Sequence, residues 1–209
     1  MEWAVIGAAL GLGALVVRGV TAFGMAGKEV GKLRKSGQGV RRLREQAQAR
    51  RWTWLPAALV PAVPVGRLAT LPNLRQRGAA HGKFRQRQAS AAVVSAVVDS
   101  GFESELEIDH GSTVLSLVIT VEAPDLPGDL HLDPRRGLGY DLSGSLAPHV
   151  TAAMLNALNA VGRPAADIAD GRASFVYPNL AAAAELDKLL AVADDVVSGL
   201  CNLLREEHP

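Results

Sequence analysis

The apolar residues at the start of the chain form one long run that a single cation interrupts. Residues 3–17 carry no charge, and after Arg18 the uncharged run resumes as far as Met25. A bilayer core about 30 Å thick needs roughly 20 helical residues. Residues 3–25 reach this length if the stem of Arg18 extends toward the lipid headgroups. The pattern therefore predicts a transmembrane helix within residues 1–25.

Small residues recur at helical spacing inside this run. Gly7 and Gly11 form a GxxxG pair, which allows two membrane helices to approach closely. We therefore expect helix–helix packing at these glycines and a homo-oligomer formed through the transmembrane helix. With Gly13 the same letters match the dinucleotide-binding loop of short-chain dehydrogenases, but the repeated alternation of strands and helices that such a fold needs does not follow.

Residues 26–51 are polar, with sparse apolar positions at helical spacing, and predict a basic juxtamembrane helical linker. Cations near an anionic membrane surface each contribute about 1 kcal/mol. We expect lipid-headgroup contact from seven cations of this segment: Lys28, Lys32, Arg34, Lys35, Arg41, Arg42 and Arg44. A stretch this basic is also compatible with nucleic acid, but it lacks the interleaved aromatic residues of a single-strand binder, so nucleic acid is the less favoured partner.

Alternating and continuous apolar runs predict strands in the second half of the chain. Residues 89–98, 103–108 and 112–122 follow one another as a predicted antiparallel meander, and residues 172–177 form a further strand. The run TVLSLVITV is apolar on both faces, which is typical of a central strand. Residues 103–108 alternate between glutamate and apolar or small side chains, so one face of that strand is expected in water.

Two segments near the carboxyl end show helical spacing, residues 147–161 and residues 181–205, with Asn179 as the expected N-cap of the second. Four prolines within residues 52–72 exclude a regular helix there and indicate an extended, packed segment. Trp52 and Trp54 would then lie on one face and close an edge of the core. The predicted fold of residues 52–209 is α+β, an antiparallel sheet with helices packed on one face.

Charge is divided unequally along the chain. Residues 1–87 hold 16 basic and 3 acidic residues, a formal charge of +13, whereas residues 88–209 hold 6 and 18, a formal charge of −12. Cations follow the apolar run, and Glu2 precedes it, which is the opposite of a secretory signal peptide. The bias places the amino terminus outside and residues 52–209 in the cytoplasm, as part of a single-pass protein of the cell membrane.

Candidate chemistry is sparse. Cys201 has no second cysteine to pair with and lies among leucines, so it is expected in the core. His81, His110, His131 and His149 lack the spacing of a metal site. Nucleophile, phosphate-binding and zinc motifs are missing from the sequence. The sequence therefore assigns no catalytic residue, metal or cofactor.

The order of segments resembles a family of uncharacterised membrane-anchored proteins of actinobacteria, a domain of unknown function. The resemblance covers residues 50–200 and rests on RRWTW, HGKFRQR, APDLPGDLHLDPR, PHVTAAMLNALNA and GRASFVY. It includes Gly82, Phe84 and Arg87, while Gln86 stands where a glycine is usual. The family implies no activity and no catalytic residues.

The sequence favours a non-enzymatic, single-span membrane protein with a cytoplasmic binding or interaction domain for a protein partner that the residues do not identify. Two alternatives stay open. One is a soluble enzyme whose first helix is buried and whose site no motif reveals. The other is a nucleic-acid-binding protein with a basic arm.

Overall fold

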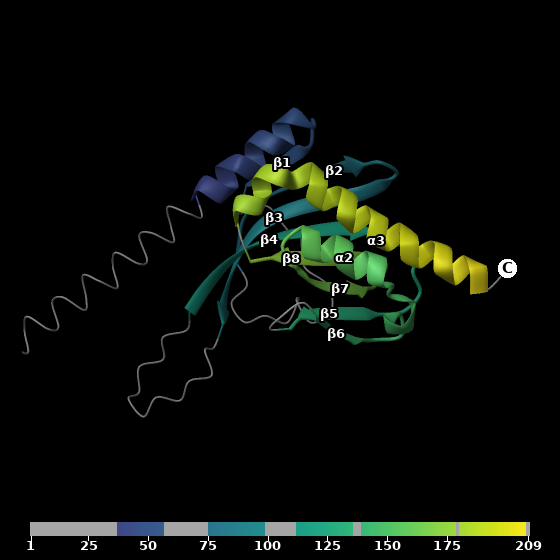
Figure 1. Ribbon diagram of the computed structural model, residues 1–209. Helices are drawn as coiled ribbons and strands as arrows, with labels where there is room; N and C mark the ends of the chain where they lie inside the picture. The colour runs from purple at the N-terminus through teal and green to yellow at the C-terminus, as the bar shows by residue number, and fades with distance from the viewer. Residues whose placement is uncertain (1–36, 57–74, 99–111, 136–138, 179, 208–209) are drawn as a thin grey trace, which may run out of the picture. The chain divides into compact units, whose positions relative to one another are not determined.

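The computed structural model describes residues 37–56, 75–98, 112–135, 139–178 and 180–207 (Figure 1). Apart from residue 37, they belong to one compact unit, Gln38–Pro209. The predicted transmembrane segment, the Glu-rich strand over residues 103–108 and the N-cap Asn179 lie outside the described residues. Within the described residues, no helix is long and apolar enough to span a bilayer.

Eight strands form a single antiparallel sheet, which confirms the predicted α+β class. The strands are β1 (Thr53–Pro56), β2 (Arg75–Phe84), β3 (Arg87–Val98), β4 (Ser112–Glu122), β5 (Leu130–Pro134), β6 (Tyr140–Ser143), β7 (Ala165–Ala169) and β8 (Arg172–Tyr177). Their order in the sheet is β1-β2-β3-β4-β8-β7-β5-β6. The first four strands therefore follow the chain, and β8 joins them to the remaining three.

Turn chemistry explains two of the tight connections. Asp170 and Gly171 join β7 to β8, and both have positive φ angles, 52° and 69°. This is the backbone of the type I′ hairpin turn that Asp-Gly pairs favour. Arg85 and Gln86 form the two-residue turn between β2 and β3, with Arg85 at φ 50°. That turn places Arg85 at the tip of the hairpin.

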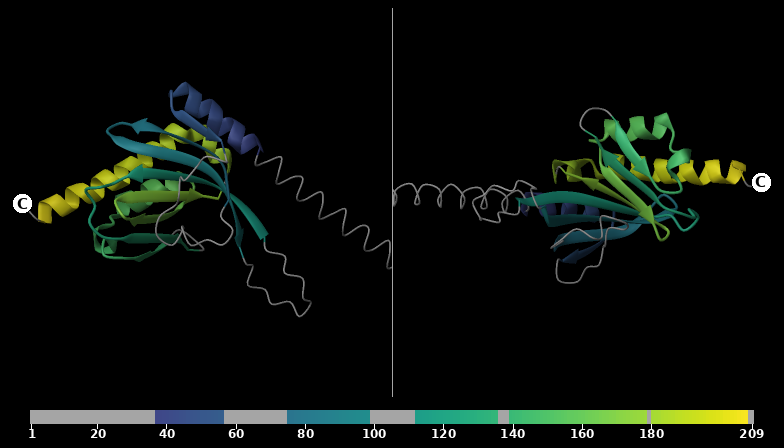
Figure 2. Two further views of the ribbon diagram at one scale, coloured as in Figure 1. Left: turned by 180° about the vertical axis from the view of Figure 1, so that it is seen from behind. Right: turned by 90° about the horizontal axis from the view of Figure 1, so that it is seen from below.

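Helices lie on one face of the sheet, as expected. Residues 37–49 are helical, and the other helices are η3 (Ala147–His149), α2 (Ala152–Ala160), η4 (Leu180–Glu185) and α3 (Leu186–Glu207). Figures 1 and 2 show α2 and α3 lying across the same side of the strands. Leu43 and Ala47 of the first helix share the main core with α3. Residues 38–49 therefore pack as part of the compact unit, although the sequence pattern groups them with the linker.

Strand alternation separates two apolar clusters. Ala91 and Val93 of β3 face the helices and belong to the main core, whereas Ala92 and Val94 belong to a smaller cluster on the opposite face. On the helix side, the rings of Trp52 and Trp54 lie against glycines of β2, which confirms that the two tryptophans share one face. Burial on both faces is why β3 and β4 read as continuous apolar runs.

The predicted boundaries are confirmed for β4 and β8 and wrong for the helices. The single helix expected over residues 147–161 is the 3₁₀ helix η3 followed by α2. Thr151 caps α2, because its hydroxyl accepts a hydrogen bond from the amide of Met154 at 3.3 Å. The last helix begins at Leu186 rather than residue 181, after the 3₁₀ helix η4. β1 occupies the start of the segment over residues 52–72 that the sequence predicts to be extended.

Candidate functional site

Three of the seven cations assigned to lipid contact lie within the described residues. Arg41, Arg42 and Arg44 are exposed on the helix over residues 37–49, and Arg41 forms an i,i+4 ion pair with Glu45 at 3.3 Å. Exposed pairs of this kind contribute well under about 1 kcal/mol to stability. The three arginines outnumber Glu45, so the helix surface has a net positive charge. Six other assigned residues lie outside the described residues: Gly7, Gly11, Lys28, Lys32, Arg34 and Lys35.

Positive charge gathers at one end of the sheet. In the described part of residues 38–98, ten lysines and arginines accompany one carboxylate, whereas the described part of residues 112–207 holds five against thirteen. The strand order places β1 and β2 at one end of the sheet and β5 and β6 at the other (Figure 1). We call seven exposed cations at the first end the basic edge: Arg41, Arg42, Arg44, Arg51, Arg75, Arg77 and Lys83.

The basic edge has the electrostatics of a surface for anionic partners. Its cations come from three elements near this end of the sheet: the first helix, the turn that follows that helix, and β2. Apart from Arg41, they have no carboxylate partner within the part of the chain that the structure describes. Their fields therefore add at this end and are screened over about 8 Å at physiological salt.

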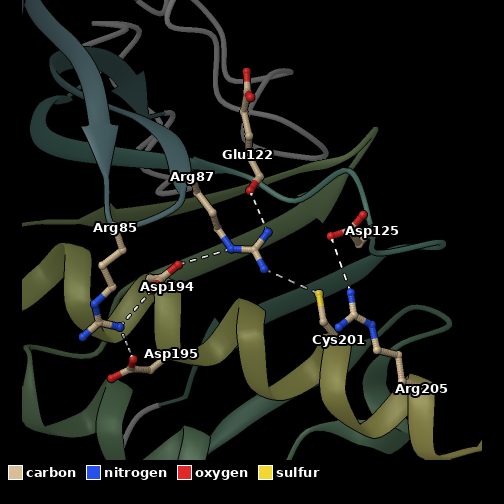
Figure 3. Close-up of polar contacts among 8 residues, drawn as sticks. All are labelled: Arg85, Arg87, Glu122, Asp125, Asp194, Asp195, Cys201 and Arg205. Carbon is tan, nitrogen blue, oxygen red and sulfur yellow. Dashed lines mark hydrogen bonds and ion pairs between the residues drawn. The ribbon is translucent and has the colours of Figure 1, made fainter.

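Two other arginines of the basic half are held by α3 (Figure 3). Asp194 of α3 binds Arg85 through one carboxylate oxygen at 2.9 Å and Arg87 through the other at 3.2 Å. The neighbouring Asp195 binds Arg85 at 2.5 Å. The Asp194 side chain is only 8% exposed, whereas that of Asp195 is 62% exposed. Asp194 is therefore the buried centre of this arginine–aspartate cluster.

Arg87 has two further contacts inside the cluster. It donates to the backbone carbonyl of Glu122 at 3.2 Å and lies 3.8 Å from the thiol sulfur of Cys201. Cys201 is buried in the main core, which confirms its predicted position. The hydrogen bonds that Arg85 donates to Asp195 and Asp194 raise the pKa of Arg85 above its ordinary value. The contacts of the two arginines fix the β2–β3 turn against α3.

A pocket of about 420 Å³ lies beside the cluster, between the β2–β3 turn, the end of β4 and α3. Its walls include Arg85, Arg87, Asp125, Asp194 and Ser198. These walls offer guanidinium, carboxylate and hydroxyl groups, which bind polar partners by charge and hydrogen bonding.

The described histidines do not converge on a metal site. His131 of β5 is buried, with one ring nitrogen at Asp167 of β7 and the other 2.7 Å from Asp133. Both ring nitrogens face carboxylates, so at least one of these hydrogen bonds is donated by a ring N–H. Among the described residues, no group of three or more potential ligands could hold a metal ion. His110 lies outside them.

Sequence reasoning assigned no role to Arg85, Arg87 or Asp194. The available signal was in the last helix, where Asp194 occupies a core-facing position four residues after Leu190. A buried carboxylate at such a position needs a cationic partner. The identity of that partner depends on the fold, because Arg85 lies 109 residues away in the chain.

Comparison with known proteins found no family model, curated protein or solved structure that matches this chain. The fold and site define an α+β unit with charge separated along its sheet. The functional argument therefore rests on the charges, contacts and burial described above.

Proposed function

We propose that this chain is a non-enzymatic, single-span membrane protein whose α+β unit lies on the cytoplasmic side and rests with its basic edge on anionic lipid. The separation of charge along the sheet is the observation that supports this proposal. The acidic end would then point away from the membrane, where it is open to a protein partner.

The position of the basic edge along the chain supports this orientation. In sequence, the helix over residues 37–49 is the described element nearest the predicted transmembrane segment. Each cation near an anionic leaflet contributes about 1 kcal/mol of electrostatic attraction. Several cations together would therefore hold the unit in one orientation against thermal rotation. Carboxylates at the other end are repelled by the same surface.

Membrane integration is tested with the full chain. After alkaline carbonate washing of membranes, we expect the protein in the pellet, because a transmembrane helix resists extraction. A reporter fused to the carboxyl end should be active on the cytoplasmic side. Recovery in the supernatant, or a reporter active outside the cytoplasm, would contradict the proposal.

Lipid contact is tested by the rate of maleimide labelling at two engineered thiols in the full chain. Gln48→Cys places a thiol on the exposed helical face that carries Arg41 and Arg44, and Leu142→Cys places one on β6 at the acidic end. The unchanged chain, with Cys201 buried, supplies the background.

In vesicles that contain phosphatidylglycerol, labelling at position 48 should be several-fold slower than in pure phosphatidylcholine vesicles. Salt at 0.5 M should restore the rate, because the Debye screening length falls from about 10 Å at 0.1 M salt to about 3 Å at 1 M. Labelling at position 142 should not depend on the lipid. Equal rates at position 48 in both lipids would overturn the contact. Salt-sensitive retention on DNA, without any lipid effect, would favour nucleic acid instead.

A further inference from the structure

Strand β6 is the last strand in the sheet order, at the end opposite the basic edge, and no described strand lies beyond it (Figure 1). Its last three residues are exposed, and Leu142 is the only large hydrophobic residue that is exposed within the part of the chain that the structure describes. The strand at the other end is protected, because β1 ends in Pro56, which has no N–H group, and the amide of Trp52 before it donates to Ala47. β6 contains no proline.

The hairpin of β5 and β6 shows which backbone groups of β6 point outward. Arg135 donates from its amide to the carbonyl of Gly139 at 3.0 Å, which makes these two residues a hydrogen-bonded pair. Such pairs alternate with non-hydrogen-bonded pairs along an antiparallel ladder. Tyr140, which lies opposite Pro134, and Leu142, two residues further, therefore do not bond to β5 through their backbones. Their N–H and C=O groups point toward the open edge.

The side chains of β6 give this edge an apolar face and an acidic face. Leu142 lies on the helix side and Asp141 on the opposite face, because side chains alternate along a strand. Asp141 is directly opposite Asp133 of β5, and like charges at such positions disfavour pairing. Arg135 binds Asp141, and His131 binds Asp133, but both carboxylates are more than half exposed. The acidic face is therefore suited to an additional cation from a partner.

We propose that β6 accepts an extended segment of a partner protein as a ninth, antiparallel strand, with an apolar side chain beside Leu142 and a lysine or arginine beside Asp141. The outward backbone groups of Tyr140 and Leu142 bond to the added strand, and the two faces select its sequence. The proposal rests on the proposed function in one respect, that the acidic end faces away from the membrane. A second copy of this chain fits less well, because two paired β6 strands would bring acidic faces together and point the two basic edges in opposite directions.

The probe is a fluorescent peptide with the sequence threonine–valine–lysine–valine–lysine–valine–threonine, titrated into the full chain in a neutral detergent. We expect saturable binding, with hydrogen exchange several-fold slower at the amides of Tyr140 and Leu142 and little changed at those of Asp141 and Ser143. Glutamates in place of both lysines should weaken binding about tenfold. N-methylation of the central valine should abolish binding because its N–H faces β6, whereas N-methylation of an adjacent lysine should not, because that N–H faces away.

Two variants of the chain test the role of charge. Asp141→Asn should weaken binding of the lysine peptide several-fold. Asp170→Asn is the matched control, because Asp170 is exposed in a type I′ turn that accepts asparagine equally well, and its affinity should equal that of the unchanged chain.

The proposal is wrong if the lysine peptide does not bind, if the glutamate peptide binds as tightly, or if methylation of the central valine has no effect. A chain that sediments as a dimer, with the Leu142 amide already protected before peptide is added, would identify a second copy as the occupant instead. Because detergent replaces anionic lipid here, failure of strand addition leaves the carbonate and labelling tests of the proposed function unaffected.

Discussion

The arginine–aspartate cluster leads to a prediction in which two neighbouring residues behave differently. Asp194 and Asp195 both bind Arg85, but Asp194 is 8% exposed and also binds Arg87, whose side chain is 17% exposed. Asp194→Asn removes the charge that compensates two guanidiniums. Arg87 would then keep a backbone carbonyl and a thiol as partners, neither of which carries a balancing charge.

The two substitutions should therefore differ in cost. Breaking a buried ion pair costs about 3–5 kcal/mol because an uncompensated charge is left behind. Arg85 is half exposed, which lets water replace part of its interaction, so we expect about 3 kcal/mol for Asp194→Asn. Asp195→Asn breaks only an exposed pair and should cost about 0.5 kcal/mol.

Urea unfolding of the full chain, followed by far-ultraviolet circular dichroism, measures both costs. With a slope of about 2 kcal/mol per molar, Asp194→Asn should lower the midpoint by roughly 1.5 M and Asp195→Asn by roughly 0.25 M. A double variant of Asp194→Asn with Arg87→Gln should lose less than the sum of the two single losses. Equal midpoints for the two aspartate variants would refute the assignment of Asp194 as the buried centre.

Three further predictions concern other parts of the sheet. His131→Gln should cost about 1–3 kcal/mol, because the buried carboxylate of Asp167 loses its hydrogen bond to the ring; a thermal-unfolding loss below about 0.5 kcal/mol would contradict this. Burial raises the pKa of Tyr140 to about 12, so the folded chain keeps a proton that the unfolded chain loses near pH 10, and Tyr140 by itself should lower the free energy of unfolding by roughly 2–3 kcal/mol between pH 10 and pH 12. Tyr140→Phe should reduce the loss of unfolding free energy between pH 10 and pH 12. An unchanged pH dependence in this variant would contradict the raised pKa of Tyr140. Gly82→Ala should destabilise by about 1–3 kcal/mol, because the new methyl carbon would overlap the Trp52 ring; an unchanged melting temperature would exclude this close packing.

Strands were predictable where their apolar residues were continuous and missed where their residues were small. β4 and β8 begin and end at the predicted residues because large apolar side chains mark them. β2 reads RQRGAAHGKF, which contains one large apolar residue, and its glycines Gly78 and Gly82 make room for tryptophan rings from a neighbouring segment. A close approach of this kind depends on tertiary contact, so local periodicity does not reveal it.

The helix boundaries carried a local signal that the apolar spacing hid. Pro148 lies in η3, and Thr151 is a favoured N-cap residue three positions later. Apolar residues on both sides of this break suggested one continuous helix. Cap chemistry therefore decides the start of α2 more reliably than periodicity does.

The unequal division of charge was visible in the sequence. The sequence does not show which cations form ion pairs within the fold and which stay exposed on its surface. Arg50 binds Asp187 near the start of α3, and Arg85 and Arg87 bind Asp194 further along the same helix. These three arginines tie the basic half to the acidic half, while the basic edge stays directed to solvent. Partly buried pairs are screened less by salt than exposed charges are. Rising ionic strength should therefore release the basic edge from an anionic surface well before it weakens the packing of α3 on the sheet.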